Sequence, residues 1–258
     1  MSVRIHPAAH VDPAARLGVD VTVGPGAVVG PDVTVGDRTR VDAHVLLTGW
    51  TTIGSECHLH HGAVLGSPPQ DLKYPGEPSY LVVGDRTVCR EYMTANLATE
   101  PGFTTRIGSD CLLMAYSHVA HNCQVGDRIV IANAVQMAGY VVVDDWAIIG
   151  GSTVVHQFTR IGRHSMIGGG SRIPQDVAPF VKCAGSPPRN AGVNSIGLER
   201  RGVPAATREA IERAYRIFFR EGLTASRAVE QIRARLPGIP EVEHFARFCE
   251  TSVRGVSR

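Results

Sequence analysis

The chain is dominated by a six-residue repeat of large aliphatic residues. Stepping by six from Ile5 to Leu65, and again from Ile107 to Ile173, every position is aliphatic, and Val83 lies on the same phase. An amphipathic helix would place apolar residues three and four apart, and a strand would alternate every two residues over a short run. A period of six instead indicates a short strand, a turn and another short strand, with the aliphatic residue pointing inward.

Three such repeats close a triangular coil of eighteen residues, and coils stack at the strand spacing of about 4.8 Å. We therefore predict a parallel β-helix of about nine coils over residues 1–190. Glycine directly follows many of the aliphatic residues, and we expect it to relax the backbone at the corners. Examples are Val23-Gly24, Val35-Gly36 and Ile107-Gly108.

Two stretches interrupt the repeat. Residues 67–80 read SPPQDLKYPGEPSY, and their four prolines and charged residues cannot continue an inward stripe. Residues 97–105, LATEPGFTT, form a shorter break. Loops on a rigid scaffold often carry binding and catalytic residues, so we expect the longer stretch to be an excursion loop beside a site.

The period stops after Pro179, and from Val203 onward apolar residues fall at helical spacing. We predict a small α-helical subdomain over residues 191–258, packed against the prism or a neighbouring subunit. Thr207 and Thr224 are candidate N-caps and Gly222 a candidate C-cap.

Composition excludes several classes of protein. The formal net charge of +2 gives no basic field for nucleic acid. There is no signal-peptide core and no run of 18 apolar residues, so we expect a cytoplasmic protein without an integral membrane segment. The six cysteines include no CxxC pair, which favours reduced thiols over disulfides or a zinc knot.

Histidines are the candidate catalytic groups. His118 and His121 flank the inward Val119, while His156 and His164 follow later in the repeat. An imidazole is the natural general base for a sugar hydroxyl near neutral pH. The chain has no GxSxG motif and no Walker loop. Direct transfer from a thioester to a hydroxyl requires only a base, an oxyanion donor and positioning.

Four segments carry a specific resemblance: GSPPQDLKYPGEPS, RIGSDCLLMAYSHVAHNCQVGD, AIIGGSTVVHQF and GVNSIGLERRG. Over nearly its whole length the chain resembles the UDP-N-acetylglucosamine O-acyltransferases that open lipid A synthesis, within the hexapeptide-repeat acyltransferases. The resemblance implies a left-handed helix, a homotrimer with sites in clefts between prisms, and no cofactor. It implies transfer of a 3-hydroxyacyl group from acyl carrier protein to the 3-hydroxyl of UDP-N-acetylglucosamine.

The resemblance also implies roles for individual residues. His121 would be the general base, and the backbone N–H of Gly139 would stabilise the oxyanion. Gln70, Asp71 and Lys73 would hold the glucosamine part, with His118 nearby. His156 and Gln157 would contact the nucleotide and sugar region. A neighbouring subunit would supply contacts to the nucleotide or its phosphates from Asn194, Arg200 and Arg201. Gly169 would set acyl length, and a glycine there predicts a long chain.

The sequence departs from the family pattern at four places that bear on sugar recognition. Tyr140 replaces a His, Asn122 an Asp beside the base, Asn96 lies in place of a His-Arg stretch, and Ile196 replaces a Glu. Three alternatives stay open: a hexapeptide acyltransferase with another acceptor such as a 3-amino sugar, a trimeric zinc enzyme of the carbonic anhydrase type using His118 and His121, and an inactive scaffold.

Overall fold

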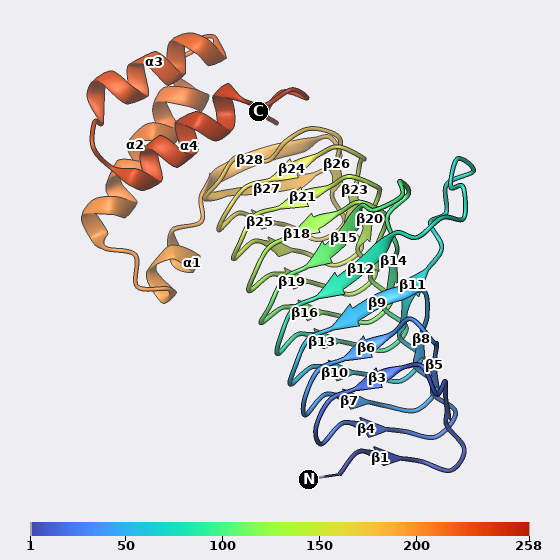
Figure 1. Cartoon of the computed structure of the whole chain (residues 1–258). Helices are drawn as coiled ribbons and strands as arrows, with labels where there is room; N and C mark the ends of the chain where they lie inside the picture. The colour runs from blue at the N-terminus through green and yellow to red at the C-terminus, as the bar shows by residue number, and fades with distance from the viewer. Residues whose placement is uncertain (1, 258) are drawn as a thin grey trace.

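The computed structural model describes residues 2–257 and contains the predicted parallel β-helix (Figure 1). Most strands are only two residues long, and three sheets run along the prism. Within the repeat, successive strands belong to different sheets, and Arg4 pairs with Thr22 one coil later. Eighteen residues per coil follow from this register, as the six-residue period predicts.

Up to β26 each sheet takes every third strand, and the hairpin formed by the last two strands extends the first sheet. The first sheet contains β1(Arg4–Ile5), β4(Thr22–Val23), β7(Arg40–Val41), β10(His58–Leu59), β13(Val88–Cys89), β16(Leu112–Leu113), β19(Val130–Ile131), β22(Ile148–Ile149), β25(Met166–Ile167), β27(Val181–Gly185) and β28(Pro188–Val193). The second sheet has nine strands: β2(His10–Val11), β5(Val28–Val29), β8(Leu46–Leu47), β11(Val64–Ser67), β14(Thr94–Asn96), β17(His118–Val119), β20(Gln136–Met137), β23(Val154–Val155) and β26(Arg172–Ile173). The third contains β3(Arg16–Leu17), β6(Thr34–Val35), β9(Trp50–Ile53), β12(Tyr80–Val83), β15(Thr104–Ile107), β18(Gln124–Val125), β21(Val142–Val143) and β24(Arg160–Ile161).

The predicted aliphatic stripe is the core of the prism. All of its members from Val23 onward are at most 3 % exposed, whereas Ile5, in the open end coil, is 47 % exposed. A second buried stripe lies two residues before each of them, and the sequence reasoning did not identify it. It consists mostly of smaller residues such as Ala27, Thr39 and Cys57, which fill the remaining space of the narrow prism beside the large aliphatic side chains.

This second stripe explains much of the cysteine usage. All six cysteines lie in the described part of the chain, are buried, and are thiols rather than disulfides. Burial raises the pKa of Cys111 to about 11 and that of Cys123 to about 12. These side chains are therefore unreactive packing groups at neutral pH.

The role predicted for the corner glycines was wrong. Left-handed backbone occurs three residues after the inward aliphatic residue, for example at Gly26 and at Arg38, with φ of 67° and 56°. The glycine directly after the aliphatic residue is needed for close approach instead. A Cβ on Gly36 would lie 2.6 Å from the carbonyl carbon of Gly54 in the next coil, so only glycine lets the coils stack there.

The two breaks insert loops between stacked coils. Ile53 pairs with Val83, and Val83 with Ile107, so sequence separations of 30 and 24 replace the usual 18. The longer loop leaves the prism between β11 and β12 and projects from its side (Figure 1). Its base is held where Ser79 Oγ donates to the Ala98 carbonyl at 2.6 Å and Asn96 Nδ2 donates to the Pro68 carbonyl at 3.2 Å.

After the β27–β28 hairpin the chain is helical. The helices are α1(Ser195–Arg200), α2(Ala205–Arg220), α3(Ala225–Arg235) and α4(Pro240–Glu250), and the last three gather beyond the final coils (Figure 1). The division proposed between residues 190 and 191 falls inside β28.

Two of the three helix boundaries that the sequence suggested agree with the structure. Thr224 caps α3 by accepting from the Arg227 N–H, and Gly222, at φ 69°, follows the end of α2. The prediction of Thr207 as an N-cap was wrong, because α2 begins at Ala205 and its N-cap is Pro204. None of the helices in residues 2–257 combines the length and apolar character that crossing a bilayer requires.

Candidate active site

A pocket of about 510 Å³ lies between the excursion loop and the turns that join the second sheet to the third. Its lining comprises Asp71, Lys73, Pro75, Thr99, Glu100, Pro101, His121, Tyr140, Gln157 and Phe158. Both breaks in the repeat therefore contribute walls, and the prism contributes the floor. Four residues predicted for the site meet here: Asp71, Lys73, His121 and Gln157.

The floor is built by the repeat itself. His121, Gly139 and Gln157 are 18 residues apart and occupy the same turn position in three successive coils, with Asn122, Tyr140 and Phe158 beside them. The Tyr140 ring meets the His121 ring edge-on at 5.4 Å and stacks on Phe158 at 4.8 Å. A ladder of rings thus fixes the imidazole at the edge of the prism.

A chain of hydrogen bonds determines which nitrogen of His121 carries the proton. Asn122 Nδ2 donates to Glu100 Oε2 at 2.7 Å, which orients the amide. Asn122 Oδ1 then accepts from the Thr99 N–H at 2.9 Å and from His121 Nδ1 at 3.0 Å. Thr99 Oγ1 also lies 2.7 Å from His121 Nδ1. Because an oriented amide oxygen can only accept, Nδ1 carries the hydrogen and Nε2 keeps its lone pair.

Glu100 is the charged end of this chain. The Tyr140 hydroxyl donates to Glu100 Oε1, and this bond, with that from Asn122, lowers the pKa of the Glu100 carboxyl. Burial, followed by the bond to Glu100, raises the pKa of Tyr140 to about 12. At neutral pH the carboxylate is therefore ionised and the phenol is a donor.

Only glycine fits at position 139 beside the His121 imidazole. A Cβ at this position would lie 2.4 Å from Cε1 and 2.6 Å from Nε2 of His121, so any side chain would displace the ring. Among residues 2–257 the N–H of Gly139 has no hydrogen-bond partner. It is a free donor beside the basic nitrogen, as an oxyanion site requires.

The other residues predicted from the loop and the neighbouring strands lie around this pocket. Lys73 and Asp71 share a turn in which the Lys73 N–H donates to Asp71 Oδ1 at 2.9 Å. Gln70 is exposed and outside the lining. His118 is half-buried, with Nδ1 2.7 Å from Thr94 Oγ1, and burial lowers its pKa.

His156 is exposed and lines a different groove, of about 560 Å³, with Val154, Ile173 and the hairpin prolines. Gly169 is exposed in the turn after β25, and a Cβ there would approach the Gly151 carbonyl oxygen at 3.1 Å. Ile196, in α1, is 65 % exposed.

Asn194, Arg200 and Arg201 lie on another edge of the same prism. Asn194 is buried and caps α1, and its Nδ2 donates to the His164 carbonyl at 3.0 Å. Arg201 donates to His164 Nδ1 at 3.2 Å and lies 4.9 Å from the Trp146 ring centroid, while Arg200 is exposed. His164 and Trp146 lie in turns that join the third sheet to the first, whereas His121 lies in a turn that joins the second sheet to the third. One chain therefore does not bring Asn194, Arg200 and Arg201 to the pocket that contains His121.

Sequence reasoning missed Thr99 and Glu100, although it had marked their segment as a break. The sequence did contain one signal. Asn122 replaces an Asp beside the base, and the loss of that carboxylate indicates that another carboxylate could lie near His121. The zinc alternative finds no support within one chain. Among residues 2–257 the candidate metal-ligand group of three or more side chains is Asp42, His58 and His60, not His118 and His121.

Comparisons with known proteins identify the family of the chain. The model described as "Udp N-acetylglucosamine O-acyltransferase; Domain 2" matches residues 176–257, and a bacterial transferase hexapeptide model matches residues 104–139. The acyl-(acyl-carrier-protein)–UDP-N-acetylglucosamine O-acyltransferase of Janthinobacterium sp. (strain Marseille) is 43 % identical over 98 % of this chain and 99 % of its own. That of Verminephrobacter eiseniae is 46 % identical at the same coverage.

Solved structures lead to the same conclusion. LpxA from Acinetobacter baumannii matches with a TM-score of 0.95 and 39 % identity over 98 % of this chain and 99 % of that one. LpxA from Bacteroides fragilis, a UDP-N-acetylglucosamine acyltransferase, matches at 0.96 and 37 %, with the same coverage. The match confirms the left-handed β-helix that the resemblance implied. On these grounds the chain belongs to the acyl-(acyl-carrier-protein)–UDP-N-acetylglucosamine O-acyltransferases.

Proposed function

We propose that this chain transfers a 3-hydroxyacyl group from acyl carrier protein to the 3-hydroxyl of UDP-N-acetylglucosamine, the first step of lipid A synthesis, in the cytoplasm. The family membership supports the reaction class. The observation that carries the chemistry is the anchoring of His121 Nδ1 by two side chains, which leaves Nε2 as a base in a ring that lines the pocket.

The steps follow from this geometry. Nε2 of His121 takes the proton of the sugar hydroxyl as its oxygen attacks the thioester carbonyl. The Gly139 N–H stabilises the negative oxygen of the tetrahedral intermediate. When the intermediate collapses, the C–S bond breaks, and the imidazolium returns its proton to the carrier thiolate. The product ester and free carrier thiol form without a covalent enzyme intermediate.

Substrate contacts are proposed for the residues around the pocket. Gln70, Asp71 and Lys73 hold the glucosamine part, with His118 nearby. Gln157, and His156 from the neighbouring groove, contact the nucleotide and sugar region. The Lys73 ammonium is exposed and can reach a phosphate or hydroxyl in the pocket.

The assembly is proposed to be a homotrimer, because one chain carries an incomplete site. Asn194, Arg200 and Arg201 lie at turns of a different edge from His121. They complete a nucleotide site only when a second prism packs against the first. Arg200 and Arg201 suit phosphates through their bidentate donors, while the buried Asn194 orients their helix.

The test is a product mass spectrum from UDP-N-acetylglucosamine and a mixed 3-hydroxyacyl carrier pool. We expect an O-acylated sugar nucleotide, and His121→Ala should lower kcat by about 10²- to 10⁴-fold. His10→Ala, at an exposed position on β2, is the control. Acylation of a 3-amino sugar nucleotide alone, or normal turnover by His121→Ala, would contradict the proposal. Sedimentation at three times the 27.6 kDa chain mass is expected.

A further inference from the structure

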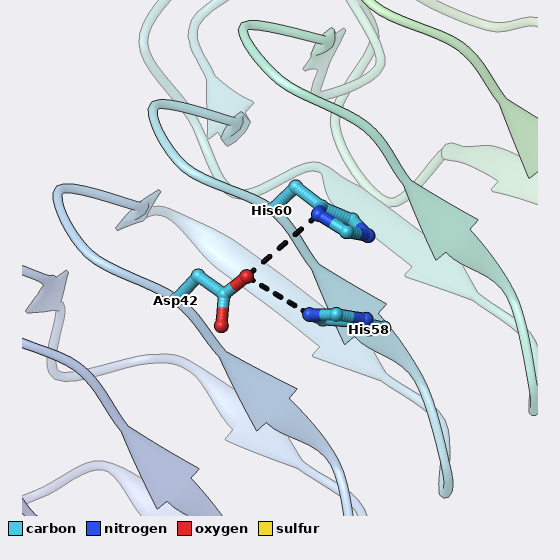
Figure 2. A group of neighbouring side chains, drawn as sticks. All are labelled: Asp42, His58 and His60. Carbon is cyan, nitrogen blue, oxygen red and sulfur yellow. Dashed lines mark hydrogen bonds and ion pairs between the residues drawn. The ribbon is translucent and has the colours of Figure 1, made fainter.

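A second cluster of ligating side chains lies outside the acyltransferase pocket. Asp42, His58 and His60 converge on the outer surface of the prism, where Asp42 follows β7, His58 lies in β10 and His60 follows it (Figure 2). All three are half-buried, and their candidate donor atoms lie within 4.8 Å of one another. None of the proposed catalytic steps uses them.

The repeat accounts for this convergence. His58 and His60 flank the inward Leu59, and residues two apart along a strand point to the same side. Their rings stack at 3.8 Å between centroids. Leu59 pairs with Val41 in the coil below, so Asp42 occupies the position directly beneath His60. Eighteen-residue stacking therefore builds a His-x-His pair with a carboxylate one coil away.

The distances suit a small divalent ion. Donors bound at about 2.0–2.1 Å in tetrahedral geometry are separated from one another by about 3.3 Å. Asp42 Oδ2 lies 2.9 Å from His58 Nε2 and 3.7 Å from His60 Nδ1. These two values bracket the tetrahedral separation, and the candidate donor atoms of all three side chains lie within 4.8 Å of one another, near the spacing that one ion requires.

Neighbouring charged groups orient the carboxylate. Arg40 Nε donates to Asp42 Oδ1 at 2.6 Å, which leaves Oδ2 toward the histidines, as outer contacts do in metal sites. Glu91 Oε1 lies 3.5 Å from His60 Nδ1 and adds negative charge, although Arg90 pairs with it at 3.0 Å. The local ligand set is two imidazoles and a carboxylate, with solvent access for a fourth ligand.

We propose that Asp42, His58 and His60 bind one divalent transition-metal ion of the Zn²⁺ type, which joins the coils containing β7 and β10. Two nitrogen donors and one oxygen donor favour Zn²⁺ or a similar ion over Mg²⁺ or Ca²⁺, which prefer oxygen alone. The site is structural, since no step of the acyl transfer passes through it.

The test is equilibrium dialysis of chelator-treated protein against Zn²⁺, with bound metal measured by mass spectrometry. We expect one equivalent per chain, and binding at least tenfold weaker in His58→Gln, His60→Gln and Asp42→Asn. His10→Gln, an exposed histidine on β2, is the matched control and should bind like the wild type. The cluster is at the surface, so circular dichroism can verify that each variant is folded.

Two further readouts keep the test decisive. The melting temperature should rise with Zn²⁺ in the wild type and not in the three variants, because only the native state is bound. Cobalt substitution should give the intense visible bands of a four-coordinate ion. Substoichiometric binding, or binding retained in all three variants, would overturn the assignment. Binding lost only in His121→Ala would place the metal in the pocket and likewise overturn it.

Discussion

Replacing Asn122 by Asp should impair the enzyme, and replacing Glu100 by Gln as well should restore it. Asn122 Nδ2 lies 2.7 Å from Glu100 Oε2, and its Oδ1 lies 3.0 Å from His121 Nδ1. The carboxylate introduced by Asn122→Asp would still accept a hydrogen bond from His121. It could no longer donate to Glu100, and the two negative charges would repel each other. The double variant exchanges the positions of acid and amide, and the amide introduced by Glu100→Gln can again donate to residue 122.

The size of the effect follows from charge and hydrogen bonding. Two unit charges of the same sign about 4 Å apart near a protein surface repel by about 4 kcal/mol. Because Glu100 is half-exposed, solvent screening reduces this repulsion to about 1–2 kcal/mol. Loss of a hydrogen bond to a charged group costs about 1.5–3 kcal/mol. The repulsion and the lost bond describe the same contact between residues 100 and 122, so their energies are not additive. Since 1.4 kcal/mol is tenfold, a loss of about 1.5–3 kcal/mol should lower kcat/KM of Asn122→Asp about 10- to 100-fold.

The assay is a double-mutant cycle on kcat/KM, with melting temperatures as the control for folding. Glu100→Gln alone should lose about 3- to 10-fold, because a neutral acceptor replaces a charged one. The double variant should recover to within about threefold of the wild type, a coupling of about 1.5–3 kcal/mol. Additive losses in the double variant would refute the hydrogen-bond chain from Glu100 to His121.

Three other predictions use separate parts of the molecule. Gly139→Ala should lower kcat at least about 100-fold in the transfer assay, because the alanine Cβ would lie 2.4 Å from Cε1 of the His121 ring. A normal rate would show that the His121 ring is not held beside residue 139. Gly169→Met should shift the product mass spectrum toward shorter acyl chains, and unchanged chain length would remove Gly169 as the determinant. Burial, followed by the Arg201 charge, lowers the pKa of His164 to about 4. A lowered folded-state pKa means that stability is lost as pH falls from about 6.5 to about 4, by about 1–2 kcal/mol after screening. Urea melts of His164→Gln should show a smaller loss over this window, and equal losses would contradict the assignment.

Most of the fold could be predicted from the sequence because each inward residue of a β-helix repeats the same environment. A single aliphatic period therefore identified the core from Val23 to Ile173. The corner glycines were misinterpreted because period alone does not separate a left-handed φ from a close backbone approach. Gly26 has the former and Gly36 requires the latter, and only the stacking of coils distinguishes them.

The site was less predictable because only part of it follows the repeat. His121, Gly139 and Gln157 are 18 residues apart, so the repeat brings them into one column. Glu100 enters from an inserted loop whose path the period does not specify. Its partnership with Asn122 depends on a contact across 22 residues that no local pattern encodes.

The most direct test is the tautomer of His121, measured by long-range proton–nitrogen NMR correlation on protein labelled at the histidine ring nitrogens. His121→Ala assigns the signal by its loss. Because His121 Nδ1 donates to Asn122 Oδ1 and lies beside Thr99 Oγ1, we expect a protonated Nδ1 and an unprotonated Nε2 in the neutral ring. A neutral ring with its proton on Nε2 would contradict the account, because no lone pair would then be available to receive the proton of the sugar hydroxyl.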